Sequence, residues 1–247
     1  MMEMKETVDK VIEFAQSETN TKSFRPDYPV SEELRESMMD TFSDFMYFTL
    51  DAYFNEVAPI LEEYVEELKT REEKKDILLH NLFWWRILYD AIYNYSESCI
   101  AEYLAEKNHE LDSRAVIVSW LKESWKASPK FYYVGYKFND RFFVVVDILT
   151  EKTIDVLVCD PLATPPKNGE IVMGTLIPLG NGLHAPIVDF YHFDYKARIE
   201  IVRHLHYYYN RYSKNLTPHE TFLHVLSAML QIERLIFIET QEKIPPK

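Results

Sequence analysis

The chain has 247 residues and a formal net charge of −13, and 47% of its side chains are hydrophobic. A chain of this length and composition buries a large core, which excludes intrinsic disorder. Its only cysteines are Cys99 and Cys159. Two cysteines are too few for a disulfide scaffold or for a zinc site made of four thiolates.

The charge is unevenly distributed along the chain. Residues 1–112 contain 26 acidic and 11 basic side chains, whereas residues 113–247 contain 14 and 16. An acidic half repels phosphates, which disfavours nucleic acid as a partner there. The first ten residues mix both signs, and no run reaches about 18 apolar residues, so we expect neither a secretion signal nor a membrane-spanning helix. The protein is therefore expected in a reducing cytoplasm.

Residues 1–127 form an acidic region in which apolar side chains recur at helical spacing. The pattern predicts a first helix over residues 4–18. It predicts a second helix that Ser31 caps and that ends at Ala58, because the residue before a proline disfavours helical backbone. Further helices are expected at about 59–70, 73–95, 97–107 and 114–126, and Ser113 is the expected cap of the last one.

Residues 128–193 form a β region, because the hydrophobic period there changes to two and all five glycines lie between 135 and 182. Turns are expected at Asn139–Asp140, at Glu151–Lys152 and at Asn181–Gly182, where both positions tolerate positive φ. The last two strands are predicted over 170–178 and 184–193. Five short antiparallel strands favour a curled sheet or a small, partly closed barrel.

Residues 194–247 are predicted to form two helices that pack back onto the helical half. Asp194 is the expected cap of the first, which reaches about Tyr212. Four of its residues at helical spacing would face the core, namely Ile199, Val202, Leu205 and Tyr209. The last helix begins at a capping box, Thr217 to Glu220, and its apolar run from Phe222 to Ile238 predicts deep burial. Together these regions predict an α+β fold with one continuous core.

Motifs exclude several chemistries. The chain has no Gly-rich phosphate loop, no dinucleotide fingerprint and no nucleophile elbow. Six of the eight histidines lie within 41 residues, but His219 and His224 are five apart. That spacing places two helical side chains about 140° apart, whereas two ligands on one helix need a spacing of four. We therefore expect neither a metal nor a cofactor.

Three functions remain open. The favoured one is a non-enzymatic protein-interaction or adaptor module with a protein partner, which also leaves a homo-oligomer open. The second is a hydrolase with its site at the junction of the sheet and the helices, made from His184, Asp189, His192, His204 and Glu220. The third is RNA binding by the basic aromatic helix 196–214, through Arg203, Tyr207, Arg211 and Lys214. The cations of that helix could equally pair with the acidic half.

The middle of the chain resembles a known group of proteins. The similarity covers about residues 80–190 and follows these segments in order: Leu82–Trp85, Tyr89–Asp90, Glu102–Leu104, Arg114, Trp120, Ser128, Phe131–Tyr132, Asp147–Thr150, Gly169–Ile171 and Leu176–Gly180. This order is similar to the body of uncharacterised bacterial proteins, common in Firmicutes, that often carry a C-terminal SEC-C zinc-binding tail. The resemblance implies a bacterial, cytoplasmic protein. The Cys-rich tail is not found in this sequence, so its zinc site is not implied, and no catalytic residue is carried over.

Overall fold

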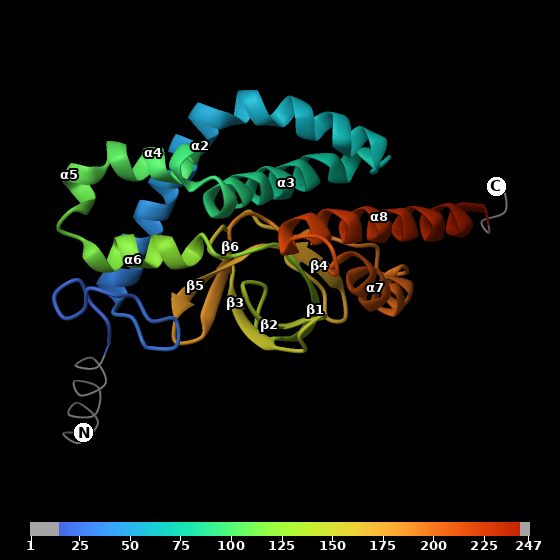
Figure 1. Cartoon of the computed structure of the whole chain (residues 1–247). Helices are drawn as coiled ribbons and strands as arrows, with labels where there is room; N and C mark the ends of the chain where they lie inside the picture. The colour runs from blue at the N-terminus through green and yellow to red at the C-terminus, as the bar shows by residue number, and fades with distance from the viewer. Residues whose placement is uncertain (1–14, 243–247) are drawn as a thin grey trace, which may run out of the picture.

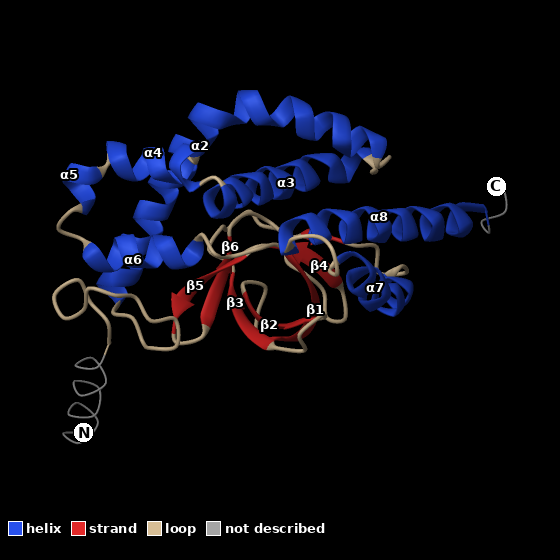
Figure 2. Cartoon of the chain, viewed as in Figure 1, coloured by secondary structure: helices blue, strands red, loops and turns tan. Residues whose placement is uncertain are grey.

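The computed structural model describes residues 15–242 and confirms the α+β class (Figure 1). Within that range the chain forms seven α-helices and one seven-stranded sheet. The sheet curls into half a barrel, and helices cover one side of it (Figure 2). The helix predicted over 4–18 lies mostly outside the described residues. Its last four positions are not helical, and Gln16 instead bridges to Val30.

The longest helix, α2, runs from Glu32 to Glu67. Ser31 caps it as predicted, because its side chain accepts a hydrogen bond from the Leu34 backbone N–H. The prediction that it ends before Pro59 was wrong, since Pro59 lies inside the helix. Pro59 is exposed and the buried face continues through it. The carbonyl that loses its helical hydrogen bond because Pro59 has no N–H can therefore bond to water, while core packing keeps the chain helical.

The other N-terminal helices are α3 (Glu72–Tyr93), α4 (Cys99–Glu106), α5 (Asn108–Leu111) and α6 (Ala115–Ser124). A 3-10 turn, η1 (Tyr95–Glu97), separates α3 from α4. Ser98 caps α4 through its hydroxyl. Ser113 does not cap α6, which starts after Arg114 without a side-chain cap. The predicted segments 73–95 and 114–126 each match an observed helix to within two residues.

The sheet has the strand order β5-β6-β3-β2-β1-β4-β7. Its strands are β1 (Lys130–Lys137), β2 (Phe142–Asp147), β3 (Thr153–Leu157), β4 (Ile171–Gly174), β5 (Leu176–Gly180), β6 (Leu183–Pro186) and β7 (Tyr191–His192). The three predicted turns are present between β1 and β2, β2 and β3, and β5 and β6. One pair, β3 with β6, is parallel.

Seven strands form instead of five because two predicted strands are interrupted. Between β4 and β5 the chain changes partners at Thr175, from β1 and β7 to β6. The Thr175 carbonyl accepts from the Ile187 N–H, which fixes this corner. At the outer edge of β5, the Trp120 indole N–H donates to the Pro178 carbonyl at 2.7 Å. The other interrupted strand is the one predicted over 184–193, in which residues 187–190 separate β6 from β7.

Buried apolar side chains form two clusters. The larger one lies between the helices and the sheet and includes Trp84, Trp120 and Phe131. The smaller one fills the inside of the half-barrel, around Phe143 and Phe190. Strand alternation explains the division, because Phe131 and its neighbour Tyr132 point to opposite faces of β1.

The C-terminal helices are α7 (Arg198–Tyr212) and α8 (Pro218–Glu242). The predicted capping box is present, because Glu220 N–H donates to the Thr217 hydroxyl and the Glu220 carboxylate accepts from Thr217 N–H. Asp194 is not the cap of α7, which begins after Ala197. The Asp194 carboxylate instead binds Arg71, in the turn before α3, and Lys74, on α3 itself.

Two expectations about burial of these helices were wrong. The buried side of α7 is Ile201 and Leu205, whereas Ile199 and Val202 are 58% and 39% exposed. Apolar residues lie on both sides of α7, and only one narrow stripe meets α8. The second half of α8 is also open, with Leu235 61% exposed. Figure 1 shows the reason, since α8 continues past the edge of the sheet.

The turn after β5 is packed against an N-terminal loop. Asn181 N–H donates to the Tyr28 carbonyl at 2.8 Å. Gly180 has φ +90°, and an added Cβ would overlap the Val30 side chain and lie 3.0 Å from the Tyr28 oxygen. Gly182 has φ +73°, but nothing lies within 4 Å of its Cβ position. Gly180 therefore carries both a backbone constraint and a packing constraint.

Replacing these two glycines separates the two constraints. Gly182→Ala introduces only left-handed backbone strain, so we expect a loss of about 1 kcal/mol in the free energy of unfolding. Gly180→Ala adds overpacking and should lose about 3 kcal/mol. Urea unfolding of both variants measures the difference. Equal losses would show that the loop containing Val30 yields without cost.

Candidate functional site

The five residues predicted for a hydrolase site lie on different elements, and only two of them, Asp189 and His192, are close enough for the imidazole to act on the carboxyl. His192 lies at the end of β7, and its Nδ1 is 3.2 Å from the Glu170 carboxylate. That hydrogen bond holds the pKa of Glu170 below its usual range against the effect of burial, which raises it. Asp189 accepts instead from the Thr164 backbone N–H, and burial raises the pKa of its carboxyl.

The other three candidates have local roles. His184 on β6 bonds through Nδ1 to the Gly182 carbonyl, and burial lowers its pKa. His204 on α7 bonds to the Glu200 carbonyl in its own helix. Glu220 is held by Thr217 in the capping box, whose N–H and hydroxyl lower its pKa. Within residues 15–242, no group of three or more His, Cys, Asp or Glu side chains is arranged to hold a metal ion.

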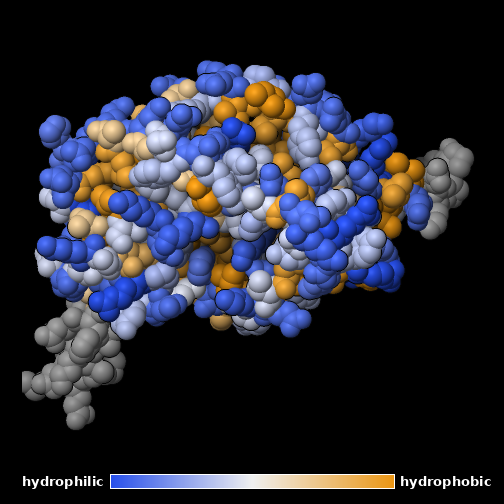
Figure 3. All heavy atoms as spheres, in the orientation of Figure 1, coloured by the Kyte–Doolittle hydropathy of each residue, from blue (hydrophilic) through white to orange (hydrophobic). Residues whose placement is uncertain are grey.

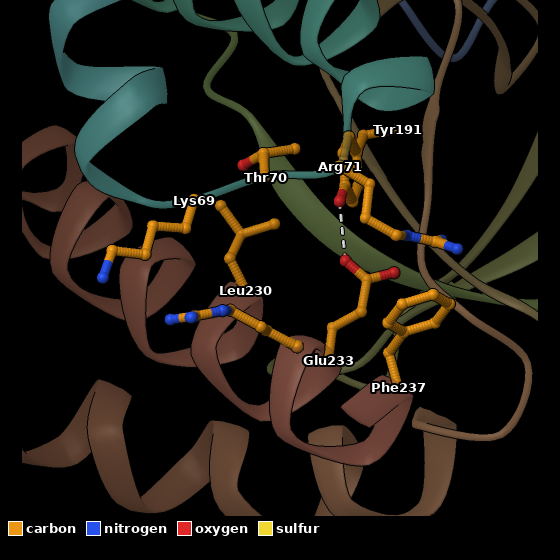
Figure 4. A pocket seen from close by; sticks show the side chains of 8 residues that line it. Lys69, Thr70, Arg71, Tyr191, Leu230, Glu233 and Phe237 are labelled. Carbon is orange, nitrogen blue, oxygen red and sulfur yellow. Dashed lines mark hydrogen bonds between the residues drawn. The ribbon is translucent and has the colours of Figure 1, made fainter. Parts of the chain in front are cut away.

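A partly buried cluster of charges lies where the start of α3, the end of β7 and the middle of α8 meet. We call it the charge cluster and define it by Arg71, Lys74, Tyr191, Asp194 and Glu233. The Lys74 ammonium donates to the His192 carbonyl at 2.7 Å, to Asp194 at 2.9 Å and to Glu233 at 2.6 Å. Figure 4 shows the Tyr191 hydroxyl facing Glu233, and the two are 2.6 Å apart.

The groups of this cluster are saturated by one another. Lys74 uses all three of its protons, and both oxygens of Glu233 accept hydrogen bonds. Burial, with the neighbouring Glu233 charge, raises the pKa of Tyr191, so its hydroxyl stays a donor. The adjoining cavity measures about 20 Å³, which is room for one water. The cluster therefore joins α3, β7 and α8 through the turn that contains Asp194, and its two central groups, Lys74 and Glu233, are fully used in these bonds.

Lys74→Met should be strongly destabilising. It leaves the buried Glu233 carboxylate without its cation, so the free energy of unfolding should fall by about 3 kcal/mol or more. Lys75→Met is the matched control on the same helix, because Lys75 pairs only with the exposed Glu66 and Glu72. Its unfolding curve should stay close to that of the original chain. Equal curves for both variants would contradict the structural role of the charge cluster.

A second buried polar group lies in the first turn of α8. His219 is 3% exposed, and neither of its ring nitrogens has a hydrogen-bond partner among the described residues. Its ring packs edge-on against Tyr89 and Tyr93, with centroids 6.1 and 5.9 Å away. Burial lowers its pKa, so the imidazole is neutral in the fold. It acts as an aromatic core residue.

This burial predicts a dependence of stability on pH. In the unfolded chain His219 takes up a proton below about pH 6.5, whereas in the fold it stays neutral to lower pH. The free energy of unfolding should therefore fall as the pH drops from 7 towards 5. His219→Phe should flatten that fall, while the exposed His206→Phe should not. Chemical denaturation at several pH values measures the slopes, and an unchanged slope in His219→Phe would refute the explanation.

Two grooves lie between the layers. One of about 440 Å³ is lined by α2, α3 and loops at the sheet edge, including Met39, Phe42 and Met46. Cys159, an exposed residue, also lines it, and partial desolvation raises the pKa of its thiol. The other, of about 410 Å³, lies between α3 and α8 and is lined by Trp85, Tyr89 and Leu223. Neither groove contains an assembled catalytic group.

The outer face of α7 is a surface where apolar and basic side chains are exposed together. We define this outer face by Ile199, Val202, Arg203, Tyr207 and Arg211, with Lys214 in the turn that follows. All six are exposed. They lie on the side of α7 opposite to Ile201 and Leu205, which pack inward. Figure 3 shows apolar side chains at the end of the molecule where α8 finishes and mostly hydrophilic ones on the surface below it.

The cations of this outer face do not pair with the acidic half. Arg203 binds Glu200 one turn earlier, and Arg211 lies over the Tyr212 ring. In the described part of the chain, neither Arg211 nor Lys214 forms an ion pair. Among the described residues, the cations of this helix therefore do not pair with the acidic half, and Arg203 pairs only with Glu200 of its own helix. Their positive charge is presented to solvent.

One described helix, α8, is long and apolar enough to cross a membrane by length and composition alone. In that stretch 39% of the residues are buried inside the fold. A core helix meets the same criterion, and the first half of α8 is one, because Phe222 packs on Phe131 and Met229 is fully buried.

The comparisons with known proteins leave the family open. The scan of family models found no match, and neither did the searches of curated proteins and of solved structures.

Proposed function

We propose that the chain is a non-enzymatic interaction module of a bacterial cytoplasm, and that the outer face of α7 binds an acidic amphipathic helix of a protein partner. The observation that carries this proposal is the exposure of Ile199 and Val202 on the same face of α7 as basic side chains, of which Arg211 forms no ion pair among the described residues. Apolar groups at the centre of a contact supply affinity when they are desolvated, and surrounding charges of one sign select a partner of the other.

The partner chemistry follows from the pattern on α7. Ile199, Arg203 and Tyr207 recur every four residues, so they lie along one side of the helix. One edge of this strip is apolar and the other edge is basic. A helix with an apolar stripe and neighbouring carboxylates is complementary to this strip. Tyr207 and the arginines belong to the residue types that dominate interface energetics.

The two other functions receive less support. The hydrolase would need its acids and histidines to converge, whereas His192 pairs with Glu170 and His204 bonds within α7. RNA binding would use the same residues of the outer face. It differs in its physical signature, because counterion release makes phosphate binding fall steeply with salt, while apolar contacts persist.

A binding measurement tests the proposal. The probe is a fluorescent helix-forming peptide with leucines on one side and glutamates along the flanks. The original chain should bind it, Arg203→Glu should weaken binding about tenfold through charge repulsion, and Ile199→Asp should weaken it even at high salt. Fluorescence anisotropy measures the dissociation constants.

A control variant separates an effect of the outer face from an effect of net charge. Lys122→Glu makes the same charge change at an exposed position on α6 and should leave binding unchanged. Binding of oligouridine RNA with a steep salt dependence, and no binding of the peptide, would replace the proposal with the RNA alternative. Loss of peptide binding in Lys122→Glu to the same extent would show an effect of net charge only.

A further inference from the structure

The second half of α2 carries an exposed surface of the opposite sign. We define this acidic face by Glu56, Ile60, Glu63 and Glu67, whose spacings of four, three and four place them on one side of the helix. All four are exposed, and Ile60 is 70% exposed. Among the described residues, none of the three glutamates forms an ion pair, whereas the adjacent Glu66 binds Lys75.

The acidic face and the outer face of α7 are complementary in composition. Each presents branched apolar side chains, Ile60 on one and Ile199 with Val202 on the other. The acidic face places glutamates around Ile60, and the outer face of α7 carries three cations, of which Arg203 is paired with Glu200. The acidic face extends over about 17 Å of helix, and the outer face of α7 is of similar length. Contact between them would desolvate the apolar groups and neutralise both sets of charges.

These two surfaces cannot meet within one chain. Figure 1 shows α2 and α7 on opposite sides of the layer that α3 and α8 form. Contacts confirm this order, because α2 packs on α3 and α7 packs on α8. A contact between the two surfaces therefore requires another molecule, and it uses a different surface on each partner.

We propose that the acidic face of a second copy of this chain binds the outer face of α7. This inference rests on the proposed function, because it names the acidic helix that the outer face binds. The contact is head-to-tail, so each copy offers one free α7 and one free α2. Such contacts close into rings or extend as filaments, and their strength depends on ionic strength.

Charge reversal in two sets of variants tests this contact. The first variant is Glu56→Lys/Glu63→Lys/Glu67→Lys, and the second is Arg203→Glu/Arg211→Glu/Lys214→Glu. In either variant both surfaces carry the same sign, so self-association should weaken about tenfold or more. An equimolar mixture restores opposite signs at every contact and should associate again. Sedimentation velocity at low ionic strength measures the average mass in each case.

The original chain supplies an independent measurement. Its average mass should rise with protein concentration at low salt and should rise less at high salt, where the charge attraction is screened and only the apolar contacts remain. Thermal unfolding and circular dichroism should be unchanged in both variants, since all six positions are exposed and outside the charge cluster. A chain that stays single at every concentration, or a mixture that does not associate, would overturn self-association. If the acidic peptide still binds the outer face, only this inference fails and the partner is a different protein.

Discussion

The fold depends on one buried ammonium, that of Lys74. It ties the start of α3 to the end of β7, to the entrance of α7 and to the middle of α8, through three acceptors from three segments. Burying these charges costs solvation energy, which mutual pairing offsets only when every partner is in place. The cluster therefore specifies one arrangement of the C-terminal helices rather than adding much stability by itself.

That arrangement decides which surfaces are left open. Because Glu233 anchors the middle of α8, the helix continues beyond the sheet, and Leu235 has nothing to pack against. Asp194 is drawn into the cluster instead of capping α7, so the helix starts later and turns Ile201 inward. The exposed strip of Ile199, Val202 and Arg203 on α7 is a consequence of how the buried charges are paired.

Features that depend on neighbouring residues could be predicted from the sequence, whereas contacts between residues far apart in the chain could not. The Ser31 cap, the Thr217 capping box and the Asn181–Gly182 turn depend on neighbouring residues, and all three were predicted. The charge cluster joins residues more than 100 positions apart, so no pattern could indicate it. The buried side of α7 was ambiguous because Ile199 and Ile201 are equally apolar. The candidate hydrolase residues were expected at the junction of the sheet and the helices, and no sequence pattern indicates that His192 pairs with Glu170 or that His204 bonds within its own helix.

The bond between Trp120 and Pro178 bears on how copies of the protein meet. An open sheet presents an edge that can template another strand, and such edges lead to irreversible aggregation. On β5, proline removes one donor and the indole occupies its carbonyl. At the opposite edge, β7 is only two residues long. The sheet therefore forms only half a barrel, but both of its edges are protected against the addition of another strand. This leaves helical surfaces as the route by which molecules can associate reversibly.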